Sequence, residues 1–196
     1  MRVGVSRAAM RSAWATLAGV LCACTSIPRD ARPVQYLDRS TAATFMVAAR
    51  PMIFAHLRPQ TAARVRDYAT VAAASLERSG LTDRIDYVLL VYFWSTVDPR
   101  YEDSAGEAVQ DVVLVADDRR IPLHPLPDLG QAPPPIGRPP VRHFVGVIYR
   151  TDLATLRYLT QAHFLSLERG TGRHKVRFGL WDDERAALRG LVRAGQ

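Results

Sequence analysis

The run from residue 87 to residue 97, YVLLVYFWSTV, limits the fold most strongly, because a strand formed there is apolar on both faces. Side chains point alternately to the two faces of a strand. Leu89 and Phe93 would share one face, and Leu90 and Trp94 the other. Such a strand is buried on both sides, as at the centre of a sheet covered by another layer.

Several segments before and after this run also predict strands. Residues 44–57 are extended and apolar, with Pro51 predicting a bulge or an edge. Residues 111–125 predict a hairpin that turns at Asp117-Asp118. Residues 61–78 leave strand and helix open, because their alanines suit a helix whereas Thr70 suits a strand. We favour a strand over residues 68–78, paired in a hairpin with the buried run.

Prolines accumulate between residues 121 and 141, including Pro133-Pro134-Pro135 and Pro139-Pro140. This density excludes regular sheet or helix, so we expect a long exposed loop there. A segment of this kind serves either as a stiff connector or as a polyproline segment that a partner recognises. We favour the connector.

The last third of the chain predicts strands and two helices. Residues 142–150 alternate as a strand, and Thr151 or Asp152 can cap the helix that follows. Residues 163–168 and 175–181 predict a hairpin around Gly170-Thr171-Gly172, and a last helix starts at Asp182-Asp183. The expected fold is mainly β or α+β: a single antiparallel β-sandwich-like domain with two short helices in the C-terminal half.

The N-terminus predicts a secretion signal. Arg2, Arg7 and Arg11 precede an apolar run over residues 13–21, with no acidic residue among them. The run is too short to cross a bilayer as a permanent helix, and it ends in Leu21-Cys22-Ala23-Cys24.

This ending resembles the lipobox of bacterial lipoprotein precursors, in which a small residue precedes a cysteine that is acylated. The resemblance implies a signal peptide over residues 1–23, cleavage before Cys24, and a bilayer anchor of acyl chains such as palmitate on Cys24. Residues 24–39 would be a flexible tether, and residues 40–196 one β-rich periplasmic domain. Thr25, in place of an aspartate, favours sorting to the outer membrane, facing the periplasm, in a host with two membranes.

The net charge of the mature chain indicates which classes of partner it could bind. Cleavage removes three of the 26 basic residues and none of the 19 acidic ones, so the mature net charge is about +4. That charge suits an envelope protein or an anionic envelope polymer, and it is too small for a nucleic-acid-binding protein.

The sequence contains no recognised catalytic motif, and its acidic clusters have local structural explanations. The chain has no Gly-x-Ser-x-Gly, Ser-x-x-Lys or His-Glu-x-x-His motif, and its five histidines are scattered, so we expect no cofactor and no metal. Asp117-Asp118 and Asp182-Asp183-Glu184 could supply paired carboxylates for glycoside hydrolysis. A hairpin turn and a helix N-terminus explain them better, so we expect no enzyme.

Basic residues surround the turn at Gly170–Gly172. Arg173, Lys175 and Arg177 alternate, and in a strand they would face away from the core residues Val176 and Phe178. With Arg169 they are the candidate contacts for an anionic partner. The alternative is a solvated edge that charge protects against unwanted strand pairing.

These observations favour a membrane-anchored envelope lipoprotein that acts as a non-enzymatic interaction or scaffold module. The second hypothesis is a small-ligand or lipid-binding periplasmic domain, which would need a cavity lined by Tyr92, Phe93 and Trp94. A cell-wall glycan hydrolase is a weaker alternative.

Overall fold

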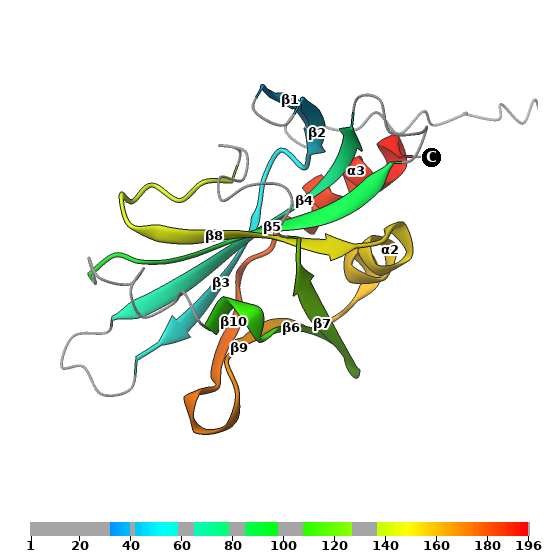
Figure 1. The fold of residues 1–196 in the computed structure, drawn as a ribbon. Coiled ribbons are helices and arrows are strands. Elements are labelled where there is room, and N and C mark those ends of the chain that lie inside the picture. Colours follow the sequence, from blue (N-terminus) through cyan, green and yellow to red (C-terminus); the bar gives the residue numbers. More distant parts are fainter. Residues whose placement is uncertain are drawn as a thin grey trace, which may run out of the picture.

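A computed structural model describes residues 32–39, 42–58, 65–78, 85–97, 108–126 and 137–195. The described residues form ten strands, two α-helices and two short 3-10 turns (Figure 1). In chain order these are β1 (Val34–Asp38), β2 (Ala43–Val47), β3 (Met52–Leu57), β4 (Arg66–Arg78), β5 (Asp86–Ser95), η2 (Ala108–Gln110), β6 (Val112–Ala116), β7 (Arg119–Pro125), β8 (Phe144–Thr151), α2 (Leu153–Gln161), β9 (Leu165–Arg169), η4 (Gly172–His174), β10 (Val176–Asp182) and α3 (Arg185–Ala194).

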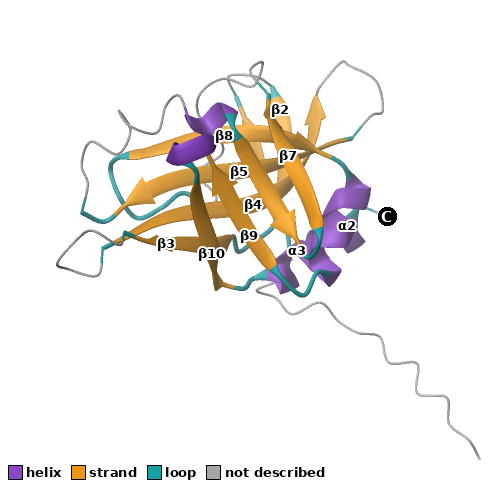
Figure 2. Ribbon diagram, turned by 90° about the horizontal axis from the view of Figure 1, so that it is seen from below, coloured by secondary structure: helices purple, strands orange, loops and turns teal. Residues whose placement is uncertain are grey.

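Eight of the strands close into an antiparallel barrel, in the order β3-β10-β9-β6-β7-β8-β5-β4, and β4 pairs with both β5 and β3 (Figure 2). The expected β-sandwich-like fold is therefore wrong. Alternation within a strand shows that both of its faces are covered. It does not show whether the inner face meets a second sheet or the far side of its own sheet, because distant pairings such as β3 with β10 decide that.

The β4–β5 hairpin is the longest pairing, with ten residue pairs from Asp67–Ser95 to Leu76–Asp86. Residues 66–78 are therefore a strand, as favoured, and not a helix. Their alanines lie opposite large side chains on β5: Ala69 faces Phe93, and Ala72 faces Leu90. This alternation of small and large residues lets both faces pack without voids.

The inner face of the barrel forms the main core, and the two helices close it at one end (Figure 2). Leu156 of α2 and Leu188 of α3 are buried in this core. Both helices were predicted, but α3 begins at Arg185 and not at Asp182-Asp183, because Asp182 still belongs to β10. Asp152 caps α2 by accepting a hydrogen bond from the Thr155 amide at 2.7 Å, as the sequence indicated.

A second apolar core lies on the outer face of β4, β5 and β8, and it includes Leu90 and Tyr92. The proline-rich segment covers part of it. The added Cβ of a residue at position 137 would lie 3.3 Å from the Ala72 Cβ, and Pro139 is buried. Gly137 has a φ of +80°, which favours glycine.

The expectation of a loop over residues 121–141 is therefore wrong at its N-terminal end, and the expected exposure fails at Pro139. Residues 121–125 belong to β7, where Pro122 pairs with Val113 of β6. Pro122 is tolerated because β7 pairs with β8 only at His124 and Pro125, so this side of Pro122 needs no amide donor. Residues 127–136 lie outside the described residues.

The segment assigned to the tether also contains a strand. β1 pairs with β2 over five residues, so Val34–Asp38, which were assigned to the tether, belong to the sheet. β2 and β3 both pair with β4, and the chain leaves the ladder between Ala48 and Pro51. The break predicted from Pro51 is thus confirmed. Within the described ranges, no helix is long and apolar enough to span a membrane.

Burial on both faces of β5 predicts that neighbouring leucines contribute similarly to stability. We expect Leu89→Ala and Leu90→Ala each to lower the free energy of unfolding by about 2–5 kcal/mol, because each removes methyl groups from a packed core. Leu57→Ala, at a half-exposed site, should cost less than about 0.5 kcal/mol. Urea unfolding measures all three. A negligible cost at Leu90 would contradict the outer core.

Candidate functional site

The predicted basic strip lies on the β9–β10 hairpin, whose register pairs Val176 with Arg169 and Phe178 with Leu167. The predicted hairpin is confirmed. Gly170 begins the turn with a φ of +79°, and a Cβ there would lie 2.8 Å from the carbonyl oxygen of His174. The turn therefore requires glycine at this position. Cys24 and the predicted signal peptide lie outside the described residues.

Arg169 is separated from the rest of the strip because it points into the barrel. It is buried, and its guanidinium carbon lies 5.1 Å from the centre of the Phe93 ring and 5.7 Å from that of Phe178. Arg169 lies two and four residues after Leu167 and Leu165, so all three side chains point to the same, inward face of β9. The alternation of residues 165, 167 and 169 in the sequence could have predicted that Arg169 faces inward.

Tyr149 is buried in the same core, and its pKa is affected both by this burial and by the charge of Arg169. Desolvation raises the pKa of the Tyr149 hydroxyl, and the positive charge of Arg169 opposes that rise. The hydroxyl donates a hydrogen bond to the Val109 carbonyl at 2.7 Å. Arg169 and Tyr149 thus belong to the barrel interior.

Lys175 lies on the outer face and is held by Glu168. The Glu168 Oε2 atom accepts hydrogen bonds from Arg120 at 2.6 Å and from Lys175 at 3.2 Å. The bond from Arg120 is the main cause that holds the pKa of Glu168 below its usual range, and Lys175 adds to it against the effect of burial. Arg120 comes from β7 and was not among the predicted contacts. The Glu168 side chain is only 9% exposed, so this carboxylate organises the two cations.

Arg173 does not continue the strip as a strand residue. It lies in η4, where it is exposed, and Lys175 comes before β10 begins. The predicted alternation of positions 173, 175 and 177 is therefore wrong at Arg173, whereas Lys175 and Arg177 both lie on the outer face.

Arg177 belongs to a surface that the sequence analysis did not identify, formed by exposed aromatic rings with arginines over them. The Arg177 guanidinium carbon lies 5.3 Å from the centre of the Phe164 ring, and its Nε donates to Ser166 Oγ at 3.2 Å. Arg66 of β4 lies 4.5 Å over the ring of Trp181. Phe164 is 47% exposed and Trp181 is 59% exposed. We call Phe164, Arg177, Trp181 and Arg66 the arginine–aromatic face.

Small side chains lie between the two arginine–aromatic pairs. Gly179 pairs with Ser166 on β9 and with Ala55 on β3, and the space above Gly179 is open. Further along this row, Tyr68 stacks on Trp94 with ring centres 4.4 Å apart. The face is therefore low in the middle and has exposed rings and guanidinium groups around it.

The acidic clusters have structural partners. Asp117 Oδ1 accepts hydrogen bonds from the amides of His163 at 2.9 Å and Phe164 at 2.8 Å, which ties the β6–β7 turn to the start of β9. Asp183 binds the side chain of Arg185, mainly through hydrogen bonds that lower the pKa of its carboxyl group. In the part of the chain that the structure describes, no three His, Cys, Asp or Glu side chains could hold a metal ion.

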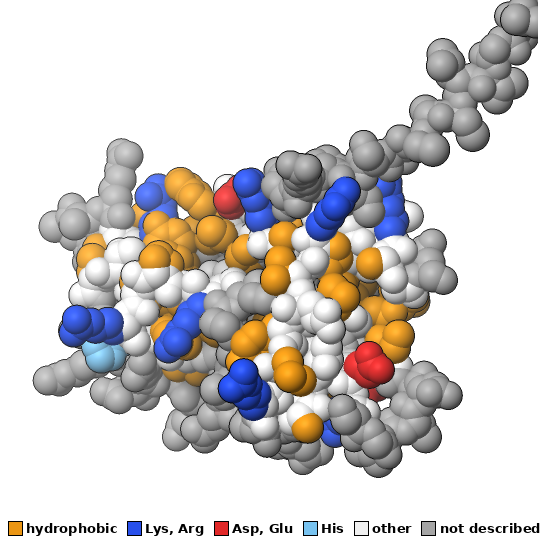
Figure 3. All heavy atoms as spheres, turned by 90° about the horizontal axis from the view of Figure 1, so that it is seen from above, with side chains coloured by type: hydrophobic (Ala, Val, Ile, Leu, Met, Phe, Trp, Pro, Cys, Tyr) orange, Lys and Arg blue, Asp and Glu red, His pale blue; other side chains and the backbone are white. Residues whose placement is uncertain are grey.

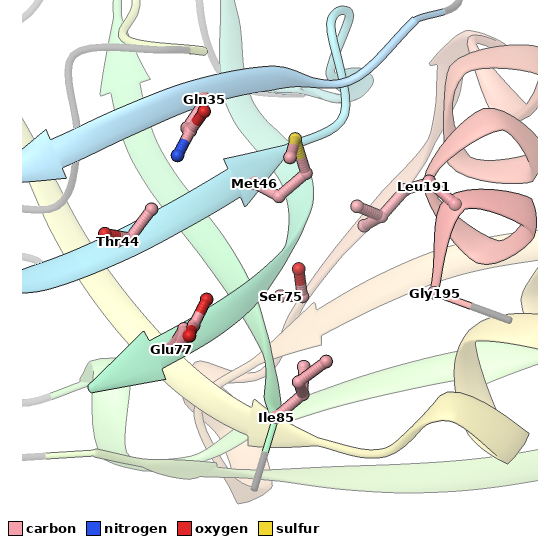
Figure 4. Close-up of a pocket in the computed structure, with 9 residues that line it drawn as sticks. Gln35, Thr44, Met46, Ser75, Glu77, Ile85, Leu191 and Gly195 are labelled. Atoms are coloured by element: carbon pink, nitrogen blue, oxygen red, sulfur yellow. The ribbon is translucent and has the colours of Figure 1, made fainter. Parts of the chain in front are cut away.

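A groove lies between the C-terminal end of α3 and the inner face of β1, β2 and β4 (Figure 4). Its volume is about 180 Å³. Met46 and Leu191 give it apolar walls, and Ser75 and Glu77 contribute polar groups. Tyr92, Phe93 and Trp94 do not line one cavity, as the ligand-binding hypothesis would require, because Phe93 faces the inner core whereas Tyr92 belongs to the outer one.

Comparison with models of known families, with curated proteins and with solved structures finds no match for this chain. The surface chemistry above is therefore the basis for a functional proposal.

Glu168 predicts a pH-dependent contribution to stability. A carboxyl whose pKa is lowered by folding stabilises the fold above its unfolded-state pKa, and this stability is lost as the pH falls through the folded-state pKa. We expect Glu168→Gln to cost about 1 kcal/mol at pH 7, a modest value because solvent screens the half-exposed Arg120 and Lys175. The difference from the parent should shrink towards pH 3 in urea unfolding. An equal difference at both pH values would show that the charge is not the cause.

Proposed function

We propose that this chain is a membrane-anchored envelope lipoprotein whose barrel is a non-enzymatic interaction module. The signal-like N-terminus and the lipobox-like ending at Cys24 support the anchor. Acylation there would hold the protein on the outer membrane, facing the periplasm. The anchor would concentrate the domain at the envelope, where we expect its partner to lie as well.

The start of β1 supports a short tether. Nine residues lie between Cys24 and Val34, the first residue of β1, so the chain takes ten Cα-to-Cα steps from one to the other. A chain of that length spans at most about 35 Å, since an extended residue covers about 3.3–3.6 Å. An anchored domain would therefore stay close to the lipid surface, which favours a partner at the membrane over one deep in the periplasm.

The arginine–aromatic face is the observation that carries the interaction proposal. Aromatic residues and arginine are enriched at protein interfaces, where they contribute most of the binding energy. Here two exposed rings lie beside two guanidinium groups, and guanidinium groups bind carboxylates through paired hydrogen bonds. An acidic protein surface is the partner that this chemistry fits best.

The groove of Figure 4 supports a second candidate, binding of a small ligand. Its mixture of apolar walls with Ser75 and Glu77 suits a small amphiphilic molecule with a polar or cationic end. Its volume of about 180 Å³ lies below the usual range for drug-sized ligands, about 300–1,000 Å³. We therefore rank it below the interaction module.

The anchor predicts a change in location. We expect the full chain to fractionate with membranes and Cys24→Ser to appear in the soluble periplasmic fraction, because the variant cannot carry acyl chains. Mass spectrometry of the N-terminal peptide of the mature parent should show the added acyl mass on Cys24. Membrane retention of the variant, with an unmodified parent, would exclude lipidation.

The arginine–aromatic face predicts which variants lose the partner. We expect the double variant Arg177→Ala, Trp181→Ala to recover at least about tenfold less crosslinked partner from the envelope, since interface arginines and tryptophans carry much of the binding energy. Arg157→Ala, at an exposed site on α2, is the matched control and should recover as much as the parent. Unchanged recovery by the double variant would move the interaction to another surface.

A further inference from the structure

β1 is the one strand, among those the structure describes, that is paired along a single edge. Each of the eight barrel strands has a neighbour on both sides, with β2 and β3 sharing one side of β4, and β2 lies between β1 and β4. Within the closed barrel, β7 meets β8 only at His124 and Pro125. Among the described strands, β1 is the one whose whole outer edge lacks a neighbour. In Figure 1, β1 lies at the periphery of the molecule.

Within β1 itself the usual protection against pairing is weak, since Arg32, Pro33 and Arg39 lie just outside the strand. Its sequence, VQYLD, contains no lysine and no proline, and its one charge is at the end. Val34 is 44% exposed and Leu37 is 57% exposed. They point to opposite faces, so a strand added here would find an apolar contact on each face. Figure 3, viewed from the side where β1 lies in Figure 1, shows hydrophobic side chains exposed among scattered basic ones.

The pattern from Arg32 to Asp38 is self-complementary about Gln35. In an antiparallel pair of two such segments centred on this residue, Arg32 of one copy is opposite Asp38 of the other. Val34 is then opposite Tyr36, and Pro33 is opposite Leu37. Opposite charges and apolar–aromatic pairs in register stabilise an antiparallel ladder. Asp38 also has an interaction within its own chain, to which this ion pair would be added.

We propose that β1 pairs with β1 of a second copy of this chain, in antiparallel register centred on Gln35. The sheet then continues from one barrel to the other around a two-fold axis, as in isologous dimers. A register centred on Tyr36 instead places Asp38 opposite Val34 and loses both ion pairs. The pairing does not depend on the anchor, although two copies on one membrane would meet more often.

A cysteine at the two-fold axis tests the register directly. The full chain with Cys22→Ser and Cys24→Ser has no thiol and no anchor. Adding Gln35→Cys places two thiols on residues directly opposite each other, whose Cα atoms in an antiparallel pair are about 4.5–5.5 Å apart, within disulfide range. We expect a disulfide dimer under mild oxidation, formed at least about tenfold faster than with Gln161→Cys, an exposed control on α2.

Similar slow rates at positions 35 and 161 would overturn the proposal, and so would a crosslink from position 35 to a different protein. Sedimentation of the thiol-free chain gives a second measure. The parent should be dimeric, and Asp38→Arg should shift it towards monomer at the same concentration. Adding Arg32→Asp to Asp38→Arg should restore the dimer, because both ion pairs are then reversed. A dimer that persists unchanged in Asp38→Arg, or that the double variant does not restore, would also overturn the register.

Discussion

The pairing of β4 with β5 is the interaction on which the rest of the structure depends. It contributes ten residue pairs, and its two strands connect the β3 side of the barrel to the β8 side. Its inner face contributes to the core under the helices, and its outer face to the core under Gly137 and Pro139. Alanine on β4 opposite leucine or phenylalanine on β5 lets the hairpin pack on both sides.

This double burial explains why the chain has two cores. An antiparallel sheet often leaves one face to solvent, but a strand without polar residues on either face cannot do so at low free-energy cost. The helices α2 and α3 cover one end of the inner core, and the segment from Gly137 covers part of the outer one. Pro139 of this segment therefore belongs to a covering layer, which needs few amide donors.

Local sequence patterns were enough to predict most strands and helices. They failed where contacts between residues far apart in the sequence determine the structure. Alternation identified β5 and the β9–β10 hairpin, and capping residues identified α2. Barrel closure depends on pairing between β3 and β10, more than 120 residues apart, which no local pattern reports. β1 was missed because five residues next to Pro33 become a strand only when β2 is beside them. The arginine–aromatic face was missed because Arg66 and Trp181 meet only after β3 has paired with both β4 and β10.

Barrel closure also determines where binding can occur. In an eight-stranded barrel, side chains can fill the interior, and here the inner side chains pack against one another and against the helices. Neighbouring residues of one hairpin then have opposite roles: Arg169 lies among aromatic rings inside the barrel, and Arg177 lies over Phe164 on the surface. Only the strand parity separates the two. Among the described residues, recognition is then left to the outer side chains of the barrel, the groove beside α3 and the free edge of β1, which the closed barrel does not use.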